Sequence, residues 1–275
     1  MKTYREGKRT TATGRARYDL LIDGIGCCLS IDPDQVVIPA ANPGCPDRVA
    51  INETNFPDPV FRNYVKGEFD GDNDDDLNAA ERGSDLLEMT HLTGLVSMKG
   101  IEFFPNMVEG YLSDNPDLLS LDLRENKQLD YLEAAHNESM SEIHLNGLSA
   151  LRHLDLNGSN LSALDLRGLT SLNAVLCNDN VNLSSLLLGH NSQLRTLDCS
   201  GSKVSNLDLR EAASLSYLFC YDTEISVLDL SGCPILLDLY QNGSVADNGS
   251  TLTYTKTGVY GYLQIDKDVT VLTGN

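Results

Sequence analysis

Apolar residues recur along the middle of this chain at a fixed interval. Segments of the form apolar-x-x-apolar begin at six leucines, namely Leu129, Leu151, Leu172, Leu194, Leu215 and Leu236. Successive segments start 21 or 22 residues apart, and Val108 and Tyr111 hold the equivalent positions one unit earlier. An interval of this length indicates a protein built from stacked structural repeats, each too small to be stable alone.

A second apolar pattern lies half a period away from the first. Its members have the form apolar-x-apolar and are Leu121/Leu123, Ile143/Leu145, Leu164/Leu166, Leu186/Leu188, Leu207/Leu209 and Leu228/Leu230. Turn-forming residues, such as those of 157–160 and 200–202, separate the two patterns. Because alternation with a period of two residues indicates a β-strand, we expect two short strands in every coil, with the leucines buried between them.

Amphipathic helices with heptad-like leucine spacing are the alternative interpretation of the same leucines. Helices do not explain why the pattern resets every 21–22 residues at Gly-, Ser- and Asn-rich turns, or why Asp so often separates two leucines. The sequence therefore favours an α/β solenoid that is rich in strands, in which 21–22-residue coils form a parallel sheet along one side.

The order of residues within one coil resembles a known family. Two coils carry Leu-x-x-Leu-x-Cys, ending at Cys199 and Cys220, and the half-coils that follow have the form Leu-x-x-Leu-Asp-Leu with Val or Ile in the first place. These motifs resemble the leucine-rich-repeat proteins of bacterial surfaces, with the period of the internalins. The resemblance implies a curved solenoid whose first strand ladder lines the concave face, and a protein that is secreted or displayed at the cell surface.

The ninth position of the repeat departs in part from the family pattern, which prefers Asn. Asn137 and Asn180 fit the pattern, whereas Ser159, Ser202 and Thr223 replace the amide side chain. Because Ser and Thr hydroxyls can also bond to nearby backbone groups, we expect them to substitute for Asn in the turn.

The segment before the repeats predicts a helix followed by a calcium-type loop. Asp58 is a plausible N-cap with Pro59 at the first helical position, and apolar residues then follow at helical spacing. The next stretch matches the EF-hand loop, with candidate ligands Asp70, Asp72, Asp74, Asp76 and Glu81. Asp75 stands where the loop normally has Gly, and Asp tolerates the left-handed conformation better than most residues.

Calcium in this loop would have a structural role, holding the small helical cap against the first repeat. A helix-loop segment also precedes the repeats in the proteins that this chain resembles. The alternative is an acidic, solvated turn that holds no metal.

Residues between the leucines of the first ladder are expected to face outward on the concave side and to form a partner-binding surface. This surface is acidic in its middle and aromatic toward its C-terminal end. Its candidate residues are His153, Asp155, Asp179, Asp198, Tyr217, Phe219, Tyr221 and Tyr240. Clustered exposed aromatic residues are typical binding anchors, so we expect a protein or a glycan ligand. One alternative is a spacer without a specific ligand, and another is that the C-terminal cap covers the rings.

Charge and motif content narrow the function classes further. The chain has 20 Lys and Arg against 40 Asp and Glu, a formal net charge of -20, which disfavours a nucleic acid partner. No apolar run has the length of a membrane span, and the basic start lacks the apolar core of a secretory signal. None of the five His residues lies in a metal-spaced cluster, and no nucleophile or phosphate-loop motif is present, so we expect no enzymatic activity.

The sequence divides into four parts. Residues 1–52 form an extension with short strands at Tyr18–Ile22 and Gln35–Pro39, and residues 53–107 form the helical cap. The repeats occupy 108–244, and 245–275 form a C-terminal β cap that covers the open end of the solenoid.

Six of the seven cysteines fall into two groups according to this division. Cys177, Cys199 and Cys220 recur at the repeat spacing and are expected to act as small buried apolar residues. The extension contains Cys27, Cys28 and Cys45, which allow one disulfide.

Overall fold

The computed structural model describes residues 48–274 in full and, before them, the backbone of five short strands. These strands are β1 (Glu6–Thr10), β2 (Ala16–Ile22), β3 (Ile25–Cys27), β4 (Ser30–Asp32) and β5 (Gln35–Val37). The two segments that the sequence marks as strands, near 18–22 and 35–39, correspond to β2 and β5. The side chains of Cys27, Cys28 and Cys45 lie outside the described residues.

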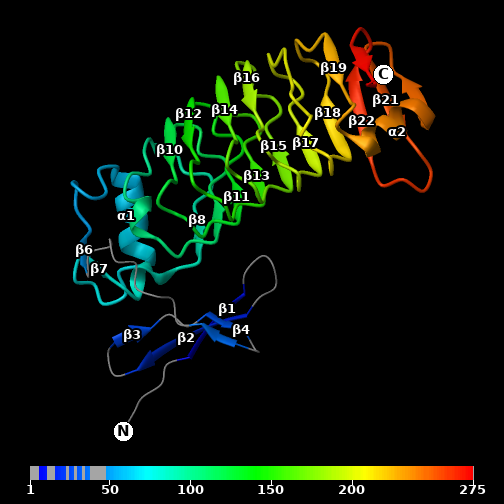
Figure 1. Cartoon of the computed structure of the whole chain (residues 1–275). Helices are drawn as coiled ribbons and strands as arrows, with labels where there is room; N and C mark the ends of the chain where they lie inside the picture. The colour runs from blue at the N-terminus through cyan, green and yellow to red at the C-terminus, as the bar shows by residue number, and fades with distance from the viewer. Residues whose placement is uncertain are drawn as a thin grey trace.

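From the cap onward the chain winds into a curved solenoid with two rows of strands (Figure 1). A ten-stranded sheet, here called the main sheet, lines the inner side of the curve. Its first seven strands are β8 (Leu86–Glu88), β9 (Glu109–Tyr111), β11 (Tyr131–Glu133), β13 (His153–Asp155), β15 (Ala174–Leu176), β17 (Thr196–Asp198) and β18 (Tyr217–Cys220). All seven pair in parallel, so the prediction of a leucine-rich-repeat solenoid with a parallel sheet is confirmed.

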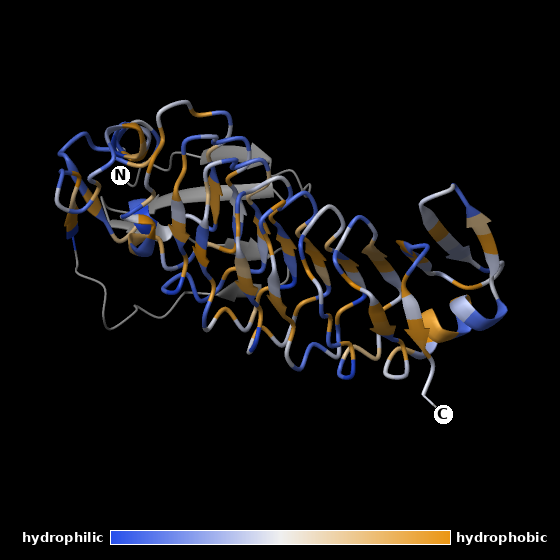
Figure 2. Cartoon of the chain, turned by 90° about the horizontal axis from the view of Figure 1, so that it is seen from above, coloured by the Kyte–Doolittle hydropathy of each residue, from blue (hydrophilic) through white to orange (hydrophobic). Residues whose placement is uncertain are grey.

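The second strand row lies on the opposite side of each coil and pairs only locally. Its strands are β10 (Ser120–Asp122), β12 (Glu142–His144), β14 (Ala163–Asp165), β16 (Ser185–Leu187), β19 (Val227–Asp229) and β23 (Thr270–Leu272). The expected rung at Leu207 and Leu209 forms no strand, although both side chains are buried. Leucines of the two rows meet in a narrow core that runs the length of the solenoid, with polar residues at the turns (Figure 2).

Every coil turns out of the main sheet through a residue with positive φ. These residues are His91, Asp114, His136, Gly158, Asp179, Gly201 and Asp222, with φ between 53° and 65°. The backbone N–H of each of the first six donates to a carbonyl of the next coil, so the turns form a continuous hydrogen-bonded ladder. Asp, His and Gly occur there because short polar side chains and glycine tolerate this conformation.

The residue after five of these seven turns is polar, and its side chain donates to backbone carbonyl oxygens. Asn137 and Asn180 each donate to two carbonyl oxygens, one in their own coil and one in the preceding coil. Ser202 and Thr223 donate one bond each, at 2.6 and 3.0 Å, to the carbonyl three residues earlier. The expectation that hydroxyls substitute for Asn is thus confirmed at these two positions. The buried Ser159 hydroxyl has no hydrogen-bond partner among the described residues.

The N-terminal cap consists of helix α1 (Pro59–Glu68) and a two-stranded sheet of β6 (Arg48–Ala50) and β7 (Asp76–Asn78). Two 3-10 turns follow, η1 (Glu81–Gly83) and η2 (Ile101–Phe103). Asp58 caps α1 as expected, because one carboxylate oxygen accepts the Val60 and Phe61 amides. Its other oxygen accepts the amides of Val96 and Ser97, so this buried carboxylate also joins the helix to the first coil.

The C-terminal end departs from the repeat. The continuation of the leucine ladder at Leu236 and Leu239 is a wrong prediction, because these residues lie in helix α2 (Pro234–Asn242). A spacing of three residues suits one face of a helix as well as the Leu-x-x-Leu start of a repeat coil, and Pro234 favours the first helical turn. The main sheet instead continues through β22 (Tyr262–Asp266), then β21 (Thr251–Thr255) and β20 (Ser244–Asp247).

Completing the row of polar core residues should stabilise the solenoid. We expect Ser159→Asn to raise the free energy of unfolding by about 0.5–1.5 kcal/mol, because the amide can donate where the hydroxyl does not. Ser202→Ala should lower it by a similar amount, since its bond to the Cys199 carbonyl is lost. Urea unfolding followed by circular dichroism measures both changes.

The exposed Ser149 provides the control, because Ser149→Asn adds an amide without burying it. A lower midpoint for Ser159→Asn would contradict the prediction and would mean that the coil is too tightly packed there for the larger side chain.

Candidate functional site

The main sheet carries two rows of side chains on its solvent-facing surface, which is the inner side of the solenoid's curve (Figure 1). In most of its short strands the central residue is buried, whereas the first and third residues are partly exposed. The first row consists of Leu86, Glu109, Tyr131, His153, Ala174, Thr196, Tyr217 and Tyr262. The second row consists of Glu88, Tyr111, Glu133, Asp155, Leu176, Asp198, Phe219 and Gln264. These sixteen positions, here called the sheet face, include five carboxylates and no Lys or Arg.

Three rings form a stack on the N-terminal half of the sheet face. Tyr131 and His153 are register partners on β11 and β13, with ring centroids 4.4 Å apart and planes inclined by 5°. Tyr111 lies on the other side of Tyr131, at a centroid distance of 5.3 Å. The ring faces are therefore turned toward one another along the solenoid axis, and the stack ends at His153, whose next register partner is the small residue Ala174.

Burial and acidic neighbours keep the two tyrosines of the stack protonated. Partial burial, followed by the charge of Glu133, raises the pKa of Tyr131 to about 12. Burial and the neighbouring carboxylate of Glu109 likewise raise the pKa of Tyr111. Both phenols are thus neutral at physiological pH and lie in a surface of negative potential.

The predicted residues His153 and Asp155 lie on the same strand and are both half-buried. Burial lowers the pKa of His153, although Asp155 and Glu133 oppose the shift. Burial raises the pKa of Asp155 against the opposing hydrogen bond from the Asn157 amide. Asp198, two strands further along, has the same surroundings, since burial raises its pKa and its carboxylate accepts the amide and hydroxyl of Ser200.

A second aromatic cluster occupies the C-terminal half of the sheet face. Tyr217 and Phe219 lie on β18 and are partly exposed, as expected. The cap strand β22 lies beside them and contributes Tyr262, which stacks on Phe219 at a centroid distance of 5.1 Å. The cap therefore adds a ring to the cluster at its edge, and the rings on β18 stay partly exposed.

The remaining predicted partner-binding residues lie apart from the two rows. Tyr221 follows β18 and is partly exposed, and Asp179 is exposed in the turn ladder. Tyr240 is on helix α2, where its ring packs against Tyr254 at 5.2 Å, because the coil that would have placed it on the sheet is replaced by the helix.

Two aromatic residues of the sheet face escape sequence reasoning. Tyr111 was assigned only as a leucine equivalent, although it takes the outward third position of β9. Tyr262 precedes Leu263 and Ile265, which alternate with polar residues as in a half-buried strand. This strand pairs with β18 in the place that the sequence assigns to the coil near Leu236.

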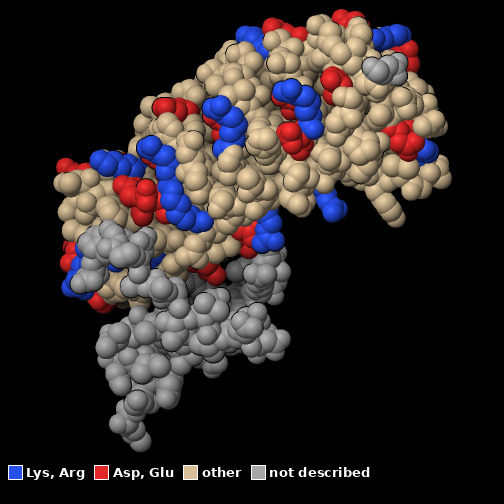
Figure 3. Space-filling view, viewed as in Figure 1, with Lys and Arg blue, Asp and Glu red and all other residues tan. Residues whose placement is uncertain are grey.

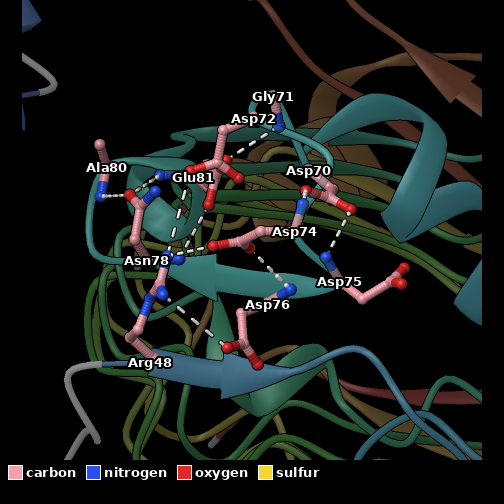
Figure 4. A network of polar contacts seen from close by, with 10 residues as sticks. All are labelled: Arg48, Asp70, Gly71, Asp72, Asp74, Asp75, Asp76, Asn78, Ala80 and Glu81. Carbon is pink, nitrogen blue, oxygen red and sulfur yellow. Dashed lines mark hydrogen bonds and ion pairs between the residues drawn. The ribbon is translucent and has the colours of Figure 1, made fainter. Parts of the chain in front are cut away.

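The acidic loop of the cap has several features of a cation site (Figure 4). Carboxylate oxygens of Asp70, Asp72 and Asp74 all lie within 4.8 Å of one another. Asp75 has φ of 62°, the left-handed conformation that the missing glycine requires. The Asp70 carboxylate accepts the amides of Asp74 and Asp75 at 3.1 and 3.2 Å, which tightens the turn around it.

Other predicted ligands of this loop have protein partners. Glu81 accepts the Gly71 and Asn78 amides, each at 2.8 Å, and therefore closes the loop through hydrogen bonds. Arg48 pairs with Asp74 and lies 4.0 Å from both Asp72 and Asp76, and Lys66 pairs with Asp75. The strand β6 pairs with β7 and places Arg48 beside the acidic loop.

Along the second strand row, acidic and basic side chains neutralise one another (Figure 3). Three Asp-x-Arg pairs, at Asp122/Arg124, Asp165/Arg167 and Asp208/Arg210, have the same two-bonded geometry with N–O distances of 2.9 and 2.6 Å. These Asp-x-Arg pairs therefore lie on a different side of the solenoid from the sheet face, whose sixteen positions hold carboxylates but no Lys or Arg.

The stacked coils, their parallel register and the row of polar turn residues define this chain as a leucine-rich-repeat solenoid. Solved structures similar to this chain include internalins of Listeria monocytogenes. The functional domain of InlJ, described as including a cysteine ladder, is 22% identical, with a TM-score of 0.47 over 68% of this chain and 46% of that one. Internalin C2 is also 22% identical, with a TM-score of 0.46 over 69% of this chain and 85% of that one.

The chain thus spans about half the length of the InlJ domain. No family model and no curated protein matches the sequence. In the part of the chain that the structure describes, no helix has the length and apolar character needed to span a membrane.

The half-buried carboxylates of the sheet face should reduce the stability of the fold at neutral pH. A carboxyl group whose pKa rises on folding stabilises the fold only while it is protonated, and this contribution is lost as the pH rises through the folded pKa. We expect Asp155→Asn and Asp198→Asn each to raise the free energy of unfolding at neutral pH by roughly 0.5–2 kcal/mol. Urea unfolding across the acid range should show this gain disappearing below the unfolded pKa, at about pH 3–4.

Asp208 is the matched control of opposite sign. Arg210 lowers the pKa of Asp208 to about 2 in the folded protein. The Asp208 carboxylate therefore stabilises the fold above its unfolded pKa, and this stabilisation is lost as the pH falls through its folded pKa. Asp208→Asn should therefore destabilise at neutral pH. If Asp155→Asn and Asp198→Asn also destabilise the fold at neutral pH, burial does not disfavour these carboxylates as described.

Proposed function

We propose that this chain is a non-catalytic binding module that recognises a protein partner through the sheet face. The single observation that carries the proposal is the pair of aromatic clusters on one surface that holds five carboxylates and no Lys or Arg. Aromatic side chains bury a large area at little entropic cost and are the usual anchors of protein interfaces. The family resemblance in the repeat supports a secreted or cell-surface location.

A spacer without a ligand is the alternative, and the sheet face argues against it. A solenoid needs only its central strand residues and its turn residues for stability, so the two outward rows are free to be small and polar. Partly exposed Tyr, Phe and His at six of these sixteen positions are more than solubility requires. A glycan stacked on the rings would use the same surface and is the second candidate ligand.

A capture experiment distinguishes a binding module from a spacer. Native chain and the Tyr217→Ser, Phe219→Ser, Tyr262→Ser triple variant are immobilised and exposed to surface protein extracts and to a glycan panel. We expect the native chain to retain a protein that the triple variant binds at least tenfold more weakly, because each buried anchor contributes more than about 1 kcal/mol.

The matched control is Tyr260→Ser, which removes a tyrosine that is 89% exposed and is not one of the sixteen sheet-face positions. Equal retention by native chain and triple variant would move the binding site elsewhere. The absence of any retained ligand would favour the spacer.

We further propose that calcium binds the acidic loop of the cap as a structural ion. Asp70, Asp72 and Asp74 would provide carboxylate oxygens as ligands, and the backbone carbonyl of Asp76 would provide a further oxygen ligand. The positive charge of the ion would hold the loop closed. Support comes from the mutual proximity of the three carboxylates and from the left-handed Asp75. Arg48 and Lys66 compensate the same charge, so the alternative is a loop held by ion pairs alone.

Thermal unfolding in calcium and in chelator tests this proposal. We expect calcium to raise the midpoint by several degrees, since saturation at 100 times the Kd adds about 2.7 kcal/mol. The Asp72→Asn variant should lose most of the shift, whereas Asp122→Asn, an exposed carboxylate outside the loop, should retain it. Identical midpoints for the native chain in calcium and chelator would leave the ion-paired loop as the correct description.

A further inference from the structure

The middle of the sheet face contains a slot between its two aromatic clusters. Along the first row, His153 and Tyr217 are separated by Ala174 and Thr196, whose side chains are small. Because neighbouring strands lie about 4.8 Å apart, the two rings are separated by about 14 Å along the sheet. Ala174 also lines a hollow with Tyr131, His153 and Asn173, so the space beside the last ring of the stack is open.

Carboxylates lie on both sides of this slot. In the second row Asp155 precedes Leu176 and Asp198 follows it, so each carboxylate is one strand spacing from the middle strand β15. One oxygen of each accepts the amide two residues later, and neither carboxylate pairs with a Lys or Arg of the described chain. Two half-buried negative charges therefore flank β15 in the second row, beside the hollow at Ala174, without an internal counter-charge.

We propose that this slot binds an arginine side chain of a protein partner. A planar guanidinium placed above Ala174 would continue the ring stack of Tyr111, Tyr131 and His153 as its next layer. Its N–H groups would lie between the carboxylates of Asp155 and Asp198, and its aliphatic part would contact Leu176. Arginine fits better than lysine because the guanidinium is planar, stacks on aromatic rings and donates in two directions at once.

Charge complementarity favours a basic group over a neutral sugar in this slot. The surroundings of His153 are acidic, with Asp155 on its own strand and Glu133 on β11, while β15 presents no charge. Arg152 lies at the rim of the hollow, but its guanidinium is bound by the Asp130 carboxylate. Since burial lowers the pKa of His153, its ring is neutral at physiological pH and can stack on a cation without repulsion.

The same groups make binding of the cation dependent on pH. Acidification protonates His153, which then repels a guanidinium. The imidazole of His136 also acts on Asp155 and opposes the rise of its pKa. Acidification also neutralises Asp155 and Asp198 at a higher pH than exposed carboxylates, because burial raises their pKa. The more distant Asp179, which acts on Asp198, does not change this direction. Affinity for arginine should therefore fall as the pH is lowered from neutral to about 5.

The test uses the full chain and N-acetyl-arginine amide as the probe. We expect the probe to shift the NMR signals of the Ala174 methyl group and the His153 ring in a saturable manner. N-acetyl-citrulline amide, which has the same shape without the charge, should leave them unchanged, and N-acetyl-lysine amide should bind more weakly. The Asp155→Asn, Asp198→Asn double variant should bind roughly tenfold more weakly, the combined effect of two partly exposed ion pairs.

Two further variants separate the slot from the rest of the molecule. Ala174→Leu fills the slot and should abolish the shift of the His153 ring while the unfolding midpoint stays close to that of the native chain. Asp165→Asn, which removes an exposed carboxylate on the second strand row, should bind the probe as the native chain does. Equal response to the arginine and citrulline probes, or binding unaffected by filling the slot, would overturn the proposal.

The inference rests on the proposed binding function, and their failures differ. If a captured protein depends on the aromatic cluster but the arginine probe moves no signal, the binding module stands and the arginine slot is wrong. If the arginine probe binds while no macromolecule is retained, the slot stands and the proposed function is wrong. Chitotriose moving the same signals where arginine does not would assign the slot to a glycan instead.

Discussion

Contact between neighbouring coils is the constraint on which this structure depends. A coil of 21 or 22 residues cannot enclose a core of its own, so its leucines are buried only when the next coil lies in register. The turn ladder fixes that register, because residues such as Asp114 and His136 adopt a positive φ and donate their amides to the adjacent coil. Stability is thus distributed along the chain, and each interface between coils depends on its own turn residues.

This constraint divides the positions of each coil by role. Central strand residues and turn residues are fixed by packing and by backbone hydrogen bonding. The outward aromatic residues of the main sheet instead contact other outward residues of the same sheet. Chemistry can therefore vary there at low cost to the fold. The ring stack from Tyr111 to His153 and the rings around Phe219 are built entirely from these outward positions. The same separation keeps the arginines of Asp-x-Arg pairs on the opposite strand row.

Sequence reasoning succeeds where one period governs the chain and fails where the period ends. The repeat predicts the strand register and most of the sheet face, because position within a coil determines which side chains point outward. It fails at Leu236, where a spacing of three residues suits both the start of a repeat coil and a helix, and so it misplaces Tyr240. Tyr262 was missed because its strand enters the sheet from the cap, a pairing between distant segments that no local pattern encodes. In the acidic loop, spacing identifies Asp70, Asp72 and Asp74 as neighbours, but the pairing of Arg48 depends on a strand from outside the motif.

The carboxylates of Asp155 and Asp198 are the positions where folding and binding make opposite demands. Each is half-buried beside apolar or aromatic neighbours, and burial shifts its pKa in the direction that disfavours the charged form. The second strand row shows that this fold can place Asp beside Arg at the same spacing, two residues later in the coil, and so remove such a cost. On the sheet face the corresponding residues are Asn157 and Ser200, which satisfy one oxygen and leave the charge uncompensated. A charge that the fold could neutralise and does not is best explained by a counter-charge that arrives with the ligand.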